Sequence, residues 1–148
     1  MVLISALAAA TEHLGLVATS SVQTEHPFVH ARRFSTLDHI TRGRVGWNIV
    51  TSTRRSEARN LGRDTVSAND VAPHAERYAA AEEYAEVVYK LWERSWADGA
   101  VIRDRAAGRY SDETKVHAID HEGPRYRRSC LISAADPSRF AALCSVAT

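Results

Sequence analysis

Hydrophobic positions in the first 52 residues switch between a helical and a strand-like pattern. Residues 2–13 are rich in Ala and Leu and contain no helix breaker, which predicts a helix. A short apolar run at 13–19 predicts a strand, the spacing over 27–41 predicts a second helix, and 45–51 predicts a second strand. The order helix, strand, helix, strand is typical of α/β proteins.

Polar side chains stand at the ends of both predicted strands. Thr19 ends the first strand, and Thr51 and Ser52 end the second, which also carries Asn48 in its middle. The second strand is apolar on both faces, which favours a parallel sheet covered by helices. Because ligands of such sheets bind at the carboxyl ends of the strands, we expect these polar groups to lie near a ligand.

The rest of the chain contains one strong helical pattern between two polar stretches. Residues 53–73 are rich in Arg, Asn, Asp and Ser without a period, which predicts a long loop. The apolar stripe over 73–98 predicts a long amphipathic helix. Residues 99–126 are polar and rich in turn residues, so we expect a loop or a small hairpin there.

Composition places the chain among ordinary globular domains. Its 148 residues, of which 45% are hydrophobic and 25% charged, are enough for one domain with a core. A net charge of +1 gives no reason to expect nucleic acid or a membrane as a partner. The start lacks a basic segment and a cleavage signal, and no apolar run approaches the ~20 residues of a membrane span. We therefore expect a soluble, cytoplasmic protein.

Three groups of residues are candidates for chemistry. His74 and Tyr78 share a face at the start of the long helix, where free N–H groups suit a phosphate. The alternative is a surface histidine beside a half-buried tyrosine, and the spacing alone favours this alternative. Two further groups contain histidines, namely His26 with His30, and His117 with Asp120 and His121. Neither has further ligands at the usual spacing, so we expect no metal.

Sequence motifs assign no catalytic residue. The chain has no G-x-S-x-G, Walker or G-x-G-x-x-G motif, so nucleophile and nucleotide motifs give no support. Cys130 and Cys144 alone make neither a disulfide framework nor a zinc site.

Two long strings carry a resemblance to a known family. They are "HPFVHARRFSTLDHITRGRVGWNIVTS" at 26–52 and "HAERYAAAEEYAEVVYKLWERSWADGAVIRDRAAGRYSDETKVHAIDHEG" at 74–123. Both resemble the two-component, FMN-dependent monooxygenases of the bacterial luciferase superfamily, in the branch with the nitrilotriacetate, dibenzothiophene sulfone and long-chain alkane enzymes. The similarity extends from about residue 3 to residue 126. It is specific for the family and says little about the substrate.

The resemblance implies an α/β fold that is part of a TIM (β/α)8 barrel. It places 13–19 on the third strand, 45–51 on the fourth, and 53–126 in the insertion after the fourth strand. A complete barrel takes about 250 residues, so we expect 1–126 to be a partial, truncated barrel of marginal stability. The tail at 127–148 resembles nothing in the family, and we expect it to be out of frame or a gene remnant.

The resemblance also implies a cofactor site and a reaction. Thr19, Ser52, His74 and Tyr78 match family positions that contact FMN, and Asn48 lies in the family string "WN-x-VTS". An NAD(P)H-dependent flavin reductase would supply reduced FMN, which with O2 inserts one oxygen atom into a small organic substrate. The intact family implies a homo-oligomer. The alternative is a non-catalytic remnant or an interaction module whose long amphipathic helix packs on a partner.

Overall fold

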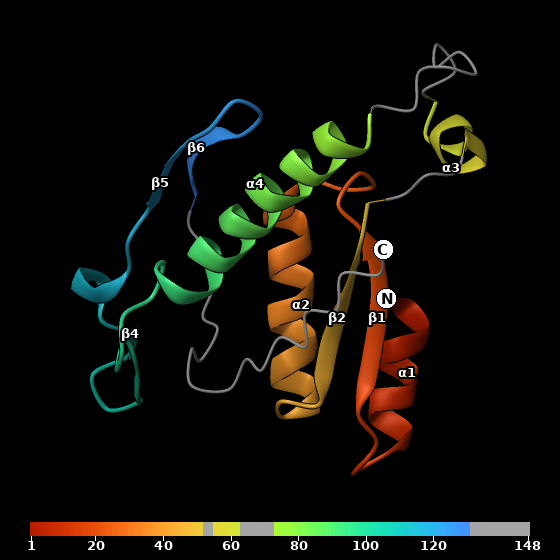
Figure 1. Ribbon diagram of the computed structural model, residues 1–148. Coiled ribbons are helices and arrows are strands. Elements are labelled where there is room, and N and C mark those ends of the chain that lie inside the picture. Colours follow the sequence, from red (N-terminus) through yellow and green to blue (C-terminus); the bar gives the residue numbers. More distant parts are fainter. Residues whose placement is uncertain (52–54, 63–72, 131–148) are drawn as a thin grey trace.

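The computed structural model describes residues 1–51, 55–62 and 73–130 (Figure 1). Its elements, in chain order, are α1 (Val2–Ala10), β1 (Leu16–Ser21), α2 (Pro27–Thr41), β2 (Val45–Val50), α3 (Arg55–Asn60), α4 (His74–Glu93), β3 (Val101–Asp104), β4 (Arg109–Ser111), the 3-10 helix η1 (Glu113–Lys115), β5 (Ile119–Glu122) and β6 (Arg127–Cys130).

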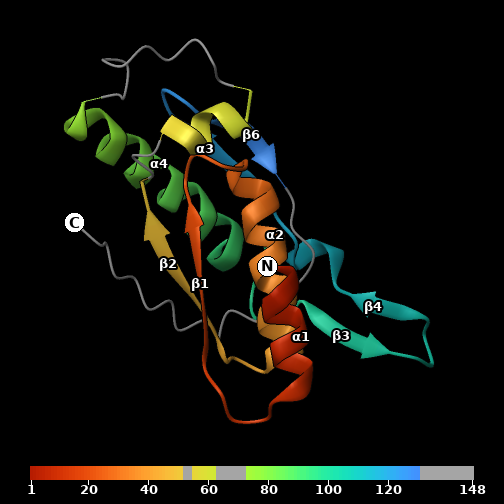
Figure 2. The same cartoon turned by 90° about the vertical axis from the view of Figure 1, so that its right-hand side faces the viewer.

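The central sheet consists of β1 and β2, which run parallel. Leu16 lies opposite Val45, and Thr19 lies opposite Asn48. This arrangement confirms the prediction of an α/β fold with a parallel sheet and fits part of a larger barrel. Figures 1 and 2 show that both strands point toward the side of the molecule on which α4 begins.

The core lies where β2, α2 and α4 meet, and α4 crosses α2 (Figure 1). Its large members include Phe34, Leu37, Trp47, Ile49, Tyr84, Val88, Leu91 and Trp92. The indole N–H of Trp47 donates to the Ser20 carbonyl at 3.0 Å, so the ring is buried without an unpaired donor. Burial of each such ring stabilises the fold by about 2–3 kcal/mol.

The predicted helix at 27–41 is confirmed as α2. It begins at Pro27, whose missing N–H costs nothing at this position, and the His26 ring accepts from the Phe28 N–H at 3.2 Å. It ends because Arg42 and Gly43 both have positive φ, at 57° and 83°.

Other boundaries differ from the prediction for physical reasons. The predicted loop at 53–73 is wrong in part, since 55–60 form α3. The long helix ends at Glu93 and not at 98. The Ser95 backbone carbonyl accepts the His117 N–H at 2.8 Å, and Trp96 forms a β-bridge with Val116, so these residues pair with a distant segment and do not continue the helix. Where a loop or a small hairpin was expected in 99–126, the structure has two antiparallel hairpins, β3–β4 and β5–β6, and the second extends to Cys130.

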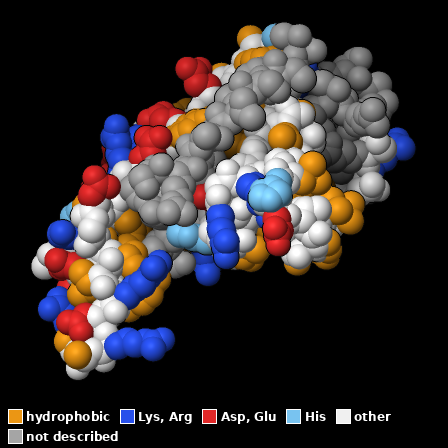
Figure 3. All heavy atoms as spheres, turned by 90° about the horizontal axis from the view of Figure 1, so that it is seen from below, with side chains coloured by type: hydrophobic (Ala, Val, Ile, Leu, Met, Phe, Trp, Pro, Cys, Tyr) orange, Lys and Arg blue, Asp and Glu red, His pale blue; other side chains and the backbone are white. Residues whose placement is uncertain are grey.

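The outer surface carries both acidic and basic side chains. Figure 3 shows acidic and basic side chains interspersed over the lower face of the molecule, as a net charge of +1 suggests. Within the described ranges, no helix is both long enough and apolar enough to cross a membrane. Of the predicted tail at 127–148, only β6 lies among the described residues.

Candidate functional site

Thr19 and Asn48 form a polar pair near the carboxyl ends of β1 and β2. They are neighbours across the sheet, and the Asn48 amide Nδ2 donates to Thr19 Oγ1 at 3.1 Å. Thr19 is exposed and Asn48 is half-buried, whereas the residue before each, Ala18 and Trp47, is buried in the core. Because side chains alternate along a strand, the pair lies on the sheet face opposite the core.

His74 and Tyr78 form the second pair, on the first turns of α4. Their rings are stacked, with centroids 4.2 Å apart and planes 26° apart. His74 is exposed and Tyr78 is half-buried. Among the residues that the structure describes, no side chain caps the first N–H groups of α4, which begins after Pro73.

Both pairs lie on the same side of the molecule. The first turn of α4 lies beyond the carboxyl end of β2 in both ribbon views (Figures 1 and 2). Ser52, the fifth predicted site residue, lies outside the described residues, and Thr51 before it is half-buried. The structure therefore joins the predicted residues into two pairs, and their convergence on one ligand stays a prediction.

The histidine groups do not form metal sites among the described residues. His26 is exposed at the cap of α2, whereas the His30 side chain is 0% exposed. His117 and Asp120 are exposed, whereas His121 is buried. Each group is thus divided between the surface and the interior.

Sequence reasoning did not identify a charged group that follows β1 in the chain. Glu25 follows the strand and contacts both His30 Nδ1, at 3.2 Å, and the Arg33 guanidinium. Burial, together with the Arg33 charge, lowers the pKa of His30 to about 3. His30 is therefore neutral at physiological pH, and its Nδ1–H donates to the Glu25 carboxylate. The available signal was Glu25 five residues before a histidine on the apolar face of a predicted helix.

Sequence reasoning also missed Glu83, a buried carboxylate on α4. It accepts hydrogen bonds from the backbone N–H groups of Arg125 and Tyr126 and from His121. Burial raises the pKa of Glu83, but the bonds from Tyr126, Arg125 and His121 outweigh burial and hold that pKa below its ordinary value. The signal was an acidic residue beside Tyr84 in the apolar part of the helix.

Comparison with known proteins gives consistent matches. The family model described as luciferase-like monooxygenase matches residues 1–142, which includes part of the predicted tail. The chain is 52% identical over 124 residues to the dimethyl-sulfide monooxygenase of Hyphomicrobium sulfonivorans, covering 84% of this chain and 25% of that protein. It is 49% identical over 125 residues to the nitrilotriacetate monooxygenase component A of Aminobacter aminovorans, covering 84% and 26%.

Solved structures agree with these matches. A riboflavin lyase crystallised with modified FMN and riboflavin superposes with a TM-score of 0.83 and 39% identity, covering 98% of this chain and 31% of that one. The chain thus spans about a quarter of the length of the curated relatives that it matches.

Proposed function

We infer the function of this chain from its family: it belongs to the luciferase-like monooxygenase family, whose model matches residues 1–142. We infer that it forms part of a flavin-dependent monooxygenase, which uses reduced FMN and O2 to insert one oxygen atom into a small organic substrate. Two similar proteins are named monooxygenases, and a similar structure holds modified FMN. Because the chain spans about a quarter of its relatives, the activity is proposed for the intact protein.

The observation that carries the proposal is the position of the two polar pairs at one end of a parallel sheet. Thr19 and Asn48 offer a hydroxyl and an amide on the open face of the sheet, which suits the polar edge of a flavin. His74 lies at a helix start without a capping side chain, which suits its phosphate. The negative charge of Glu76 in the same turn disfavours a bound anion. The Arg125 guanidinium, 3.4 Å from the Glu76 carboxylate, offsets this charge.

These residues would bind and orient the cofactor, and none of them has to act as a nucleophile or as a general acid or base. FMN, when bound, supplies the oxygen-activating chemistry. Ser52, two residues after the end of β2, would add a second hydroxyl. The wall formed by α4 would exclude water from one side of the flavin, which protects reactive species from hydrolysis.

Partners form a second part of the proposal. An NAD(P)H-dependent flavin reductase would supply the reduced FMN, and the name "component A" of one relative supports such a division of labour. A homo-oligomer fits the exposed apolar residues Val2 and Ile40, which line a groove of about 570 Å³ between α1 and α2. The alternative, a long helix that packs on a partner chain, is not supported. The apolar face of α4 is buried against α2 and β2 in this chain.

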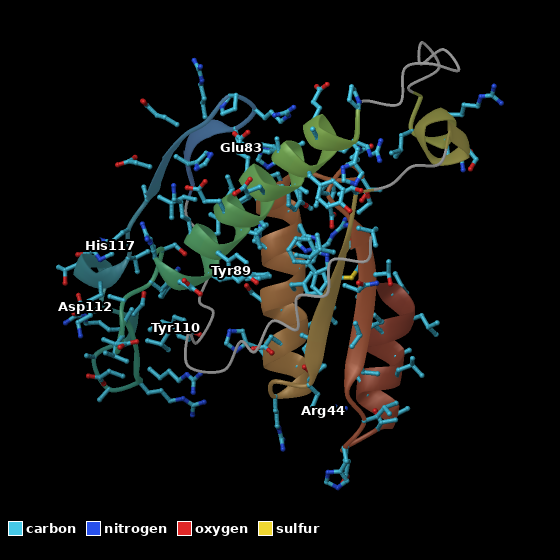
Figure 4. The ribbon with its side chains drawn as sticks, in the orientation of Figure 1. Arg44, Glu83, Tyr89, Tyr110, Asp112 and His117 are labelled. Carbon is cyan, nitrogen blue, oxygen red and sulfur yellow. The ribbon has the colours of Figure 1, made fainter. Side chains whose placement is uncertain are left out.

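Flavin binding tests the proposal directly. The purified chain of 148 residues is titrated with FMN, and quenching of flavin fluorescence gives the Kd. His74→Ala and Thr19→Ala should each raise the Kd about tenfold, which is the loss of one charge-assisted or well-placed hydrogen bond. His117→Ala, at an exposed histidine next to η1 and beyond the C-terminal end of α4, is the matched control (Figure 4). Equal Kd values for all of these variants and the wild type would contradict the placement of the site.

A further inference from the structure

Glu83 is an acidic side chain held inside the protein at the contact between α4 and hairpin β5–β6. It is 7% exposed, and Figure 4 shows it on the side of α4 that faces the hairpin. Its Oε1 accepts the Arg125 N–H at 3.0 Å and the Tyr126 N–H at 2.9 Å. One carboxylate therefore binds two consecutive backbone donors of the turn that joins β5 to β6.

Gly123 allows the carboxylate to approach this closely. A Cβ atom at this position would lie 2.1 Å from Glu83 Oε1 and 2.6 Å from His121 Nε2. Both distances are far below van der Waals contact, so any larger residue would displace Glu83 or the turn. The glycine and the glutamate thus form one matched contact, although they are far apart in the sequence.

His121 and Lys90 support the carboxylate from the other side. The Lys90 ammonium lies 3.1 Å from His121 Nδ1, and Glu86 contacts the same ammonium at 2.6 Å. Because an ammonium only donates hydrogen bonds, His121 Nδ1 accepts from it, and the ring proton sits on Nε2. That Nε2–H faces Glu83 Oε1 at 3.4 Å, so all three partners of the carboxylate are donors.

The turn held by Glu83 carries Tyr126 toward the carboxyl end of the sheet. The Tyr126 ring lies edge-on to His26, with centroids 5.6 Å apart, and edge-on to Tyr84, with centroids 6.0 Å apart. His26 caps α2, just after the loop that follows β1. The Tyr126 ring packs against the core, which is the sheet face opposite Thr19, and the neighbouring Arg125 contacts Glu76 in the first turn of α4 at 3.4 Å. The turn that carries Tyr126 therefore lies along the first half of α4, the helix that begins at His74.

We propose that Glu83 is a positioning residue, which clamps the turn at 123–126 on α4 and so fixes Tyr126 against His26 as an aromatic wall of the flavin site. The inference rests on the proposed function for the identity of the ligand. The clamp itself rests only on the contacts of Glu83 and Gly123. A tyrosine fixed before the ligand arrives loses less freedom on binding, which improves affinity.

Three variants test the role of Glu83 in the chain of 148 residues. Glu83→Ala removes all acceptor atoms, Glu83→Gln keeps one carbonyl oxygen for the two backbone donors, and Glu82→Ala removes the exposed neighbouring acid as a control. Amide hydrogen exchange of Arg125 and Tyr126 and the proton contact between the Tyr126 and His26 rings are measured by NMR without flavin. The Kd for FMN is then measured by fluorescence.

For Glu83→Ala we expect exchange at both amides to become at least about tenfold faster, loss of the ring contact, and a Kd raised about tenfold. Glu83→Gln should restore both within about threefold of the wild type, and Glu82→Ala should change neither. Intact ring contact in Glu83→Ala, or an unchanged Kd once that contact is lost, would overturn the inference. If Glu83→Ala fails to fold, Gly123→Ala, which displaces the carboxylate but retains it, must give the same changes.

The two sets of measurements separate this inference from the proposed function. A wild-type chain that binds no FMN would refute the proposed ligand. The amide and ring measurements would still show whether Glu83 holds Tyr126 in place.

Discussion

Arg44 connects four segments at the amino end of the sheet, and its removal should destabilise the fold strongly. Its guanidinium donates to the carbonyl of Thr41 at 2.9 Å, of Leu14 at 2.8 Å, of Thr11 at 2.9 Å and of Ala8 at 3.1 Å. These carbonyls belong to the end of α2, the connection before β1 and the last turn of α1 (Figure 4). One side chain therefore ties α1 to the start of β2.

The expected magnitude follows from these contacts. A hydrogen bond to a charged group contributes about 1.5–3 kcal/mol when buried. Arg44 is only half-buried, and water replaces part of each bond in the variant, so about 0.5–1 kcal/mol per carbonyl is a better measure. With the favourable position of a cation at the end of α1, Arg44→Ala should lower the free energy of unfolding by about 2–4 kcal/mol.

Urea unfolding followed by tryptophan fluorescence measures this change. Arg44→Lys offers one ammonium in place of a planar fork, so it should recover less than half of the loss. Arg42→Ala, at an exposed arginine two residues away, is the control and should change stability by less than about 0.5 kcal/mol. A loss in Arg44→Ala below about 1 kcal/mol, or equal to that of Arg42→Ala, would refute the reasoning.

Three further predictions concern single positions. Arg42→Gly should stabilise the chain by about 0.5–1 kcal/mol in urea unfolding, because Arg42 has φ of 57°, where glycine is not strained; a loss of stability would contradict this. Tyr84→Phe should leave the free energy of unfolding, and with it the melting temperature, unchanged or raised, because the buried Tyr84 hydroxyl has no hydrogen-bond partner among the described residues. A loss of unfolding free energy above about 1 kcal/mol would contradict this. The stability that Glu83 confers, measured as wild type minus Glu83→Ala, should be complete above pH of about 4.5. Since the pKa of Glu83 is lowered in the folded state, the part of this difference that depends on the charged carboxylate should be lost as the pH falls through that pKa, and a difference that grows toward acid would refute the argument.

Local patterns predicted the elements of the first half well. The bounds of α2 follow from Pro27 and the positive φ at Arg42 and Gly43, which are properties of neighbouring residues. The strand at 45–51 was recognised because apolar residues on both faces belong to a buried parallel strand. Thr19 and Asn48 were named as site residues from their positions near strand ends, and the structure brings them into contact.

The face of α4 was predicted less well. The expected stripe ran through Tyr78, Ala81, Ala85, Val88, Leu91 or Trp92, and Ser95. The structure buries Val88, Leu91, Trp92 and Ser95 of this stripe, leaves Ala81 and Ala85 half-buried, and buries Glu83, Tyr84 and Val87 in addition. The helical repeat determines the spacing of the apolar residues, but it does not determine which of two adjacent faces of the helix is buried more deeply. That choice depends on the rings of Phe34 and Trp47, which come from other elements.

Short-range chemistry in the chain is thus sufficient for the order of helices and strands, for their parallel pairing and for the polar residues at their ends. The pairing in hairpins β3–β4 and β5–β6, the burial of His30 and the clamp between Glu83 and Gly123 could be known only from the folded molecule. The burial of His30 requires α4 and β2 to pack on α2, and the clamp requires hairpin β5–β6 to pack on α4, so both depend on residues that are distant in the sequence. A carboxylate in a helix is read as a surface group until the donors that surround it are seen.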